Sequence, residues 1–236
     1  MRAGPVFLPR FLNQIKSVMQ TYRLRRIQNK PLLNGNLQGS PWREIEPLSV
    51  DSFPWYASGK KQRTTVKLCY DARALYLLFW CEDSHISAEC TNLNDAVCRD
   101  SCVEFFCSLP PDGRPDYVNL EMNCCGVMHM GYGPDMTHRR MVTPELAAGI
   151  RVFHTVPGAP KTESPEDREW LLEVELPFKV LSDFVGHPIE SRGSWRANFY
   201  RCGGITDAQY ACWSPVGTPR PNFHQPNCFG VLEFED

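Results

Sequence analysis

The 236-residue chain lacks any run of about 18 apolar residues, so no transmembrane helix is predicted. Its formal net charge is only −2 and its body carries no basic stripe, which argues against a nucleic-acid partner. It also lacks the G-x-S-x-G and H-E-x-x-H motifs, a glycine-rich phosphate loop and any C-x-x-C pair. These absences argue against an integral membrane segment. They also mean that the common sequence motifs of catalytic and zinc-binding proteins are missing.

The first thirty residues contain no acidic side chain, because the first one in the chain is Glu44. They carry seven lysines and arginines, and apolar residues between Phe7 and Met19 recur at helical spacing. Such a segment is typical of an organelle presequence, although a short helix docked on the domain has the same pattern. Its apolar stretches are too short for a secretory signal. We therefore predict a basic amphipathic leader or docked helix over residues 1–21 and one domain over residues 22–236.

The eleven cysteines show no zinc-ligand spacing, and several of them lie within apolar runs. In that setting a free thiol behaves as a small hydrophobic group. Reduced cysteines are typical of a compartment that does not favour disulfides. The sequence therefore predicts an intracellular protein, either cytoplasmic or mitochondrial.

Short alternating segments separated by prolines and glycines predict an all-β chain with many short strands. Their number favours one antiparallel β-sandwich of jelly-roll or immunoglobulin-like architecture. The segment 75–81 is apolar almost throughout, so we expect both of its faces to be covered. Strands are expected over residues 31–37, 65–70, 75–81, 101–108, 117–130, 150–156, 170–176, 195–201 and 230–234, and a short helix over residues 178–184.

Polar side chains on two of the expected strands share one face. Glu104 alternates with apolar residues in the segment 101–108, and Asn119, Glu121 and Asn123 alternate with apolar residues in the next strand. A face with these carboxylates and amides can hydrogen-bond a polyhydroxylated ligand. A plain solvated face is the competing interpretation.

A second group of polar and aromatic residues lies near the end of the chain. Arg201 ends a strand that mixes arginines, an amide and aromatic rings, and Phe223 and His224 lie in a proline-rich loop. Aromatic faces flanked by hydrogen-bonding groups suit a sugar, whose C–H groups stack while its hydroxyls bond. We expect Trp213 to be a core residue and Phe223 to be the exposed ring.

Two other uses of these segments stay open. Glu104 and Glu121 have the residue types of a glycosidase pair, which would make the chain a glycoside hydrolase or a module associated with one. Met128, His129 and Met130 lie together on one expected strand and include the residue types that ligate haem axially.

Seven blocks of the body stand out by their residues and their order. They are V-x-L-x-Y-D at 66–71, L-Y-x-x-F at 75–79, D-x-x-V-E-F-F at 100–106, W-x-x-E-V-x-L-P-F at 170–178, R-A-N-F-Y at 196–200, W-S-P at 213–215 and F-H-x-P-x-x-F-G-x-L-x-F at 223–234. Together they resemble the carbohydrate-binding module family 9-like domains of the DOMON-like superfamily. The resemblance extends from about Tyr22 to Glu235.

This resemblance implies a β-sandwich that binds sugars without catalysis. It implies polar contacts from Glu104, Asn119, Glu121 and Tyr200. We expect Arg201 and His224 to border the site. Members of the family clamp the sugar between two tryptophans. Here the resemblance places Val97 where one of them belongs and Phe223 where the other belongs. Calcium occurs in some members, and DOMON-like relatives include haem binders.

The sequence therefore predicts non-catalytic carbohydrate binding through a polar-aromatic site, with a saccharide as partner. No cofactor is required for this function. A haem-binding DOMON-like domain, a glycan-associated hydrolase and a protein-interaction domain are the alternatives.

Overall fold

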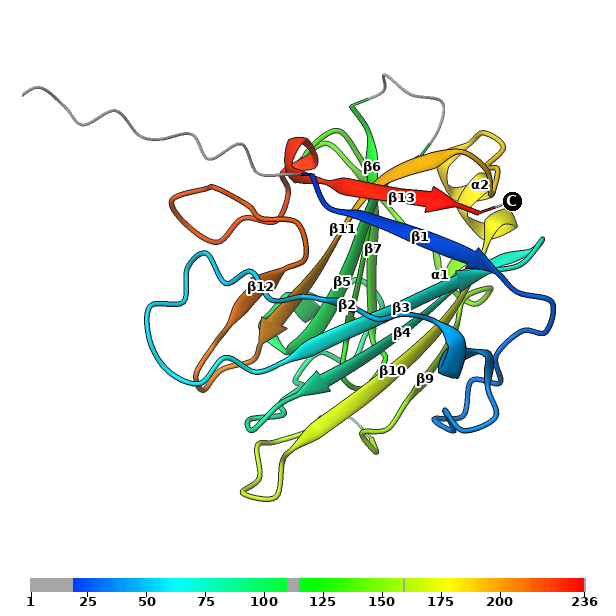
Figure 1. Ribbon diagram of the computed structural model, residues 1–236. Coiled ribbons are helices and arrows are strands. Elements are labelled where there is room, and N and C mark those ends of the chain that lie inside the picture. Colours follow the sequence, from blue (N-terminus) through cyan, green and yellow to red (C-terminus); the bar gives the residue numbers. More distant parts are fainter. Residues whose placement is uncertain (1–18, 110–114, 159, 236) are drawn as a thin grey trace, which may run out of the picture.

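The computed structural model describes residues 19–109, 115–158 and 160–235 (Figure 1). Within these ranges, thirteen strands form one curled sheet, and two α-helices pack near one end of it. The strands are β1 (Thr21–Arg26), β2 (Leu48–Ser49), β3 (Thr64–Tyr70), β4 (Ala74–Glu82), β5 (Ser101–Ser108), β6 (Tyr117–Asn123), β7 (Met128–Gly133), β8 (Arg140–Met141), β9 (Arg151–His154), β10 (Glu169–Pro177), β11 (Ser194–Gly203), β12 (Tyr210–Cys212) and β13 (Gly230–Phe234). The α-helices are α1 (Pro144–Ala147) and α2 (Phe178–Val185), and the 3₁₀ turns are η1 (Pro41–Glu44), η2 (Val97–Arg99) and η3 (Pro226–Cys228).

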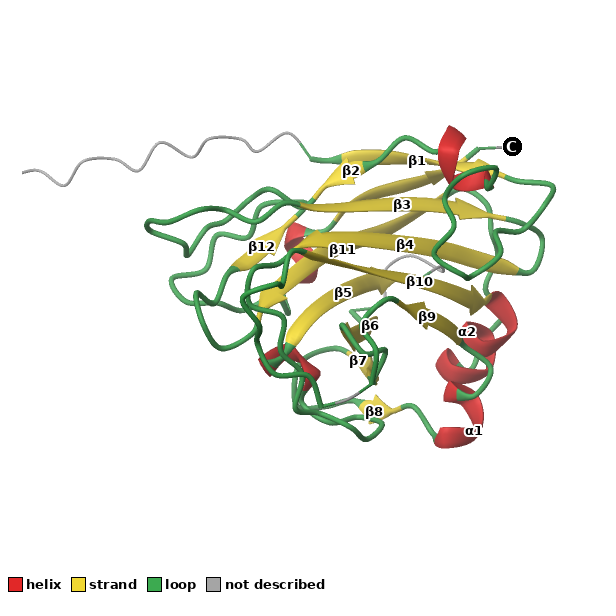
Figure 2. Cartoon of the chain, turned by 90° about the horizontal axis from the view of Figure 1, so that it is seen from below, coloured by secondary structure: helices red, strands yellow, loops and turns green. Residues whose placement is uncertain are grey.

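Strand β1 links the two halves of the sheet. The strand order is β8-β7-β6-β5-β11-β13-β1-β3-β4-β10-β9, with β12 on β11 and β2 on β3. Residues 21–24 of β1 pair with β13 and residues 25–26 pair with β3, and both pairings are parallel. The sheet curls so that its two halves enclose the main core (Figures 1 and 2). The all-β expectation is confirmed, whereas the expectation of purely antiparallel pairing was wrong for β1.

The inward faces of the strands follow the period of two expected for a pleated sheet. On β3, Val66, Leu68 and Tyr70 belong to the main core, as their alternation predicts. On β5, Val103 and Phe105 face the same core, while Phe106 packs on the opposite face in a second apolar cluster. The sheet around β5 therefore has apolar packing on both of its faces.

The outer face of β4 is also covered, as its apolar sequence predicts. Trp42 of η1 packs there in a third apolar cluster with Tyr76 and Leu78. The fully buried carboxylate of Glu173 fixes this covering segment, because it accepts hydrogen bonds from Trp42 Nε1 at 2.8 Å and from the Gly35 amide at 2.7 Å. Gly35 has a φ of +73°, a conformation that favours glycine.

Two sequence expectations about strands were wrong. The segment 117–130 is not one strand, because the chain turns between β6 and β7, where Gly126 adopts a φ of +77°. Residues 31–37 form bends and irregular coil rather than an edge strand, and Leu37 packs against the cluster on the outer face of β4. The helix expected over residues 178–184 is confirmed as α2, which ends at Gly186 with a φ of +80°.

The predicted leader falls mostly outside the described residues, which begin at Met19. Within the described part, Thr21 already belongs to β1, so the first strand begins one residue before the predicted domain boundary. No helix in the described ranges combines the length and apolar character needed to span a bilayer.

We predict that Glu173→Ala lowers the free energy of unfolding by about 2–4 kcal/mol, because it leaves a buried indole N–H and a backbone N–H without acceptors. Urea unfolding of the full chain measures this change. Glu169→Ala, an exposed position on the same strand, is the control and should change stability by less than about 0.5 kcal/mol. An equal effect of both substitutions would contradict the role given to Glu173.

Candidate functional site

A pocket of about 570 Å³ lies on the face of β5, β6 and β11 that is turned away from the main core. The strands supply its floor, η2 supplies one wall, and the loop before η3 supplies another. Its lining residues are Cys98, Arg99, Glu104, Glu121, Met136, Cys202, Tyr210, Arg220, Pro221, Asn222, Phe223 and His224.

The floor of the pocket is built by strand register. Glu104 on β5 is directly opposite Glu121 on β6 and directly opposite Tyr200 on β11. Directly opposite residues of neighbouring strands point to the same side of the sheet, so both carboxyl groups face the pocket. They are nevertheless buried, with exposed fractions of 2% for Glu104 and 6% for Glu121.

Each of these carboxyl groups has one oxygen held by the protein. Glu104 Oε1 accepts a hydrogen bond from the Cys202 thiol at 3.1 Å, and Glu121 Oε1 accepts one from Asn119 Nδ2 at 2.8 Å. The second oxygen of each carboxyl group, Oε2, has no hydrogen-bond partner among the described residues. Neither Oε2 atom is among the polar atoms that are fully enclosed without a partner, so both remain accessible to solvent. These two oxygens can therefore receive a ligand.

Burial controls the protonation of the carboxyl pair. Burial, reinforced by the neighbouring Glu121 carboxylate, raises the pKa of Glu104 well above its ordinary value. Burial also raises the pKa of Glu121, but the nearby His129 and Arg139 and the Asn119 amide oppose that shift. The pKa of Glu104 is therefore raised further than that of Glu121, so burial favours the neutral form of Glu104 more strongly.

A chain of hydrogen bonds fixes the imidazole of His224. Arg139 Nη2 donates to the Tyr117 hydroxyl oxygen at 2.8 Å, and that hydroxyl lies 2.7 Å from His224 Nδ1. Burial, with Arg139 and His129 adding to it, lowers the pKa of His224 to about 4, so the ring is neutral at pH 7. A neutral imidazole has one N–H donor and one acceptor nitrogen. His224 thus brings an uncharged hydrogen-bonding ring to the pocket.

The aromatic wall is less exposed than expected. Phe223 is only 7% exposed, because its ring stacks on Tyr200 at a centroid distance of 4.2 Å and also contacts Trp55 at 5.7 Å. The Tyr200 hydroxyl in turn donates to the Phe223 carbonyl at 3.0 Å. The expectation that Phe223 is an exposed ring was wrong. The expectation that Trp213 is a core residue is confirmed.

The structure brings four of the seven predicted site residues together at the pocket: Glu104, Glu121, Phe223 and His224. Asn119 and Tyr200 lie directly behind them. Asn119 is fully buried, donates to Glu121 and accepts from Arg139, while Tyr200 is fully buried beneath Phe223.

Arg201 does not border the pocket. It follows Tyr200 on β11 and therefore points to the opposite side of the sheet, where it is 3% exposed. Its guanidinium forms an ion pair with the buried Asp83 carboxylate and lies 5.2 Å from the Trp170 ring. The prediction of Arg201 as a site residue placed it on the wrong face.

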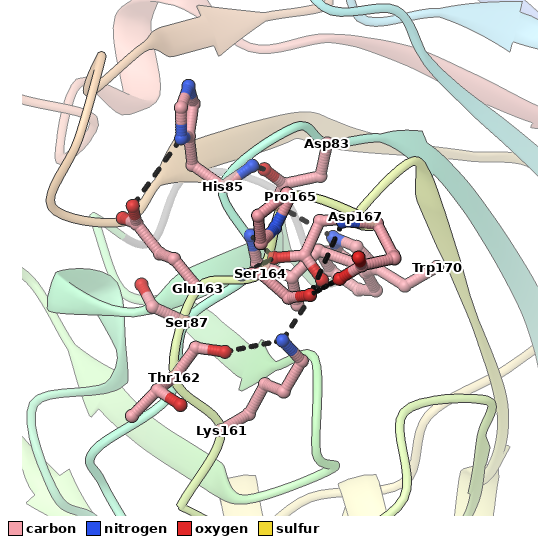
Figure 3. Close-up of polar contacts among 12 residues, drawn as sticks. Asp83, His85, Ser87, Lys161, Thr162, Glu163, Ser164, Pro165, Asp167 and Trp170 are labelled. Carbon is pink, nitrogen blue, oxygen red and sulfur yellow. Dashed lines mark hydrogen bonds and ion pairs between the residues drawn. The ribbon is translucent and has the colours of Figure 1, made fainter.

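Asp83 belongs to a polar cluster that ties two loops together (Figure 3). It accepts a hydrogen bond from Trp170 Nε1 at 3.1 Å. Nearby, Asp167 accepts from the backbone amides of Ile86 and Ser164 and pairs with Lys161 at 3.0 Å. These contacts join the segment after β4 to the segment before β10, so the cluster has a structural role.

Sequence reasoning found Phe223 and His224 but missed other pocket residues outside the two polar strands. Val97, where the resemblance placed a missing tryptophan, is fully buried in the second apolar cluster, whereas the adjacent Cys98 is exposed and lines the pocket. Met136 and Tyr210 come from segments whose meeting depends on the tertiary fold. Cys98, one residue after Val97, and Cys202, two residues after Tyr200, did have a sequence signal.

The candidate haem ligands Met128, His129 and Met130 all lie on β7. Met128 and Met130 belong to the main core, and His129 Nδ1 lies 3.1 Å from the Asn94 and Asp95 carbonyl oxygens. The described part of the chain contains no group of three or more His, Cys, Asp or Glu side chains placed to hold a metal ion.

The fold and the pocket define a β-sheet protein with a small-molecule site on one sheet face. The model of carbohydrate-binding family 9 matches residues 42–234, and the chain belongs to this family. A search of curated proteins finds no match.

Solved structures share the fold. A protein from Bacteroides uniformis ATCC 8492, named as a "putative carbohydrate-binding protein", superposes with a TM-score of 0.79 at 25% identity and covers 92% of this chain and 100% of its own. A family 9 carbohydrate-binding module from Caldicellulosiruptor kristjanssonii in complex with glucose has a TM-score of 0.58 at 12% identity, covering 92% of this chain and 96% of its own. A family 9 module from the same organism in complex with cellotriose also has a TM-score of 0.58 at 12% identity, covering 92% of this chain and 94% of its own.

We predict that Glu104→Gln stabilises the protein more at pH 8 than at pH 5. The raised pKa of Glu104 means that folding takes up a proton above the pKa of the unfolded chain, so wild-type stability is lost as pH rises toward the folded-state pKa. Glutamine needs no proton. Urea unfolding at the two pH values measures the difference, with Glu169→Gln as the exposed control. A gain independent of pH would show that Glu104 is already ionised in the folded protein.

Proposed function

We propose that this chain is a non-catalytic carbohydrate-binding domain, spanning about residues 22–236, whose ligand enters the pocket on β5, β6 and β11. Membership of carbohydrate-binding family 9 supports this proposal. Modules with the same fold from Caldicellulosiruptor kristjanssonii are known in complex with glucose and with cellotriose, which adds support. In this proposal the two halves of the curled sheet act as the layers of a β-sandwich.

The observation that carries the proposal is the polar set at the pocket floor. A sugar hydroxyl both donates and accepts hydrogen bonds. The Glu104 carboxyl, the free oxygen of Glu121 and the imidazole of His224 supply these functions next to the buried ring of Phe223 and the partly buried ring of Tyr210. Such a combination of a few directed polar groups with apolar walls suits a saccharide.

Family membership favours binding over glycoside hydrolysis, because the family whose model matches the chain is one of carbohydrate-binding modules. Glu104 and Glu121 stand side by side on adjacent strands, so both approach a ligand from the floor.

We also propose that the saccharide is bound inside the cell. All eleven cysteines are free thiols, and eight of them are buried. This state supports a reducing compartment, cytoplasmic or mitochondrial.

Calorimetric titration of the full chain with glucose and with cellotriose tests the proposed function. We expect saturable binding by at least one of them, weakened at least tenfold by Glu121→Ala, because this substitution removes an acceptor at the floor. Glu169→Ala, far along the chain on β10, should bind as the wild type does. Absence of binding at millimolar sugar would contradict the proposal.

We predict that Cys98→Trp tightens glucose binding about five- to tenfold, because it supplies a large aromatic surface at the pocket wall. The same titration measures the change. Val97→Trp is the matched contrast: Val97 is buried, so the larger ring should overpack the second cluster and lower stability by about 1–3 kcal/mol. Weaker binding by a folded Cys98→Trp variant would show that the sugar does not contact this wall.

A further inference from the structure

The rim of the pocket carries cationic side chains without anionic partners. Arg99 of η2 and Arg220 of the loop before Phe223 are exposed and line the pocket from two different segments. Neither forms an ion pair with an acid in the described ranges, although nine other lysines and arginines do. Guanidinium groups left free at a pocket are ready to receive an anion.

A third arginine adds positive charge behind this rim. The Arg139 guanidinium donates to Tyr117 and Asn119, which are both neutral, and lies 5.0 Å from the Tyr117 ring. Asp135, the acid closest to it in sequence, is engaged by the amide and ring of His138. The positive charge of Arg139 is therefore not cancelled by a direct ion pair.

The acidic groups of the pocket lie apart from these guanidinium groups. Glu104 and Glu121 are on the floor, at neighbouring positions of β5 and β6, and both are buried. Arg99 and Arg220 come from η2 and from the loop before η3, and both are exposed. Burial also raises the pKa of both carboxyl groups, which favours their neutral forms and weakens their hold on the rim charges.

We propose that the pocket selects saccharides that carry an anionic group, a carboxylate or a phosphate, held at the rim by Arg99 and Arg220. This inference rests on the proposed function and names its ligand class. The sugar ring lies over the carboxyl pair, its hydroxyls bonded to Glu104 and Glu121, while the anionic substituent points outward to the guanidinium groups. The rim is solvent-exposed, so the attraction depends on ionic strength.

Titration of the full chain at pH 7 with glucose, glucuronic acid, glucose 6-phosphate and inorganic phosphate tests this assignment. The first three ligands share one sugar ring and differ in the group at C6. We expect glucuronic acid, glucose 6-phosphate or both to bind about five- to tenfold more tightly than glucose at low salt, and the one that does identifies the anion. The ratio of the affinity for the anionic sugar to the affinity for glucose should fall toward one in about 0.5 M salt, because salt screens the attraction.

Arg220→Gln should lower the same ratio, whereas Arg73→Gln, an exposed arginine outside the pocket, should leave it unchanged. If glucose binds and neither anionic sugar binds more tightly, the inference is overturned and the proposed function stands. If inorganic phosphate binds as tightly as glucose 6-phosphate, the site is an ion site only and the inference is also overturned. If no sugar binds at millimolar concentration, both proposals fail.

Discussion

The direct opposition of Glu104 and Glu121 across β5 and β6 is the constraint on which the site depends. This register is set from the other side of the sheet, where Val103, Phe105 and Leu120 are packed into the main core. A slip of one residue would turn the carboxyl groups into that core and the apolar side chains out of it. The hydrophobic pattern of two strands thus places two acids beside each other, and their burial and closeness raise the pKa of Glu104.

The covering of this sheet face turns polar residues into a binding site. Without it, Glu104, Asn119 and Glu121 would form a solvated surface with ordinary titration behaviour. The second apolar cluster excludes much of that solvent, with Phe106, Tyr117, Tyr200 and Phe223 packed around the polar residues. In such surroundings a hydrogen bond to the free carboxyl oxygens gains in strength, and an unpaired polar group becomes expensive. A hydroxyl-rich ligand meets both conditions.

Sequence reasoning succeeded where a side chain's position follows from local alternation. The period of two placed Glu104 and Glu121 on one face, and the apolar run of β4 implied a cover on both sides. The same rule places Arg201 and Tyr200 on opposite faces of their strand, so the sequence could have shown that Arg201 does not belong to the site. The burial of Phe223 could not be predicted in this way, because it depends on contacts with Tyr200 and Trp55, which are distant in sequence. The pairing of β1 with both β13 and β3 likewise depends on contacts between the ends of the chain.

The central claim is that two buried carboxyl groups with raised pKa values, those of Glu104 and Glu121, form the floor of a saccharide pocket. The most direct test is ¹³C NMR of the Glu104 and Glu121 side-chain carboxyl groups, titrated with pH in the free protein and then with added glucose or glucuronic acid. The account predicts that both groups titrate above an ordinary glutamate, Glu104 above Glu121, and that both signals shift as the sugar binds. Two carboxyl groups that titrate as ordinary glutamates, or signals that do not respond while sugar binds, would contradict it.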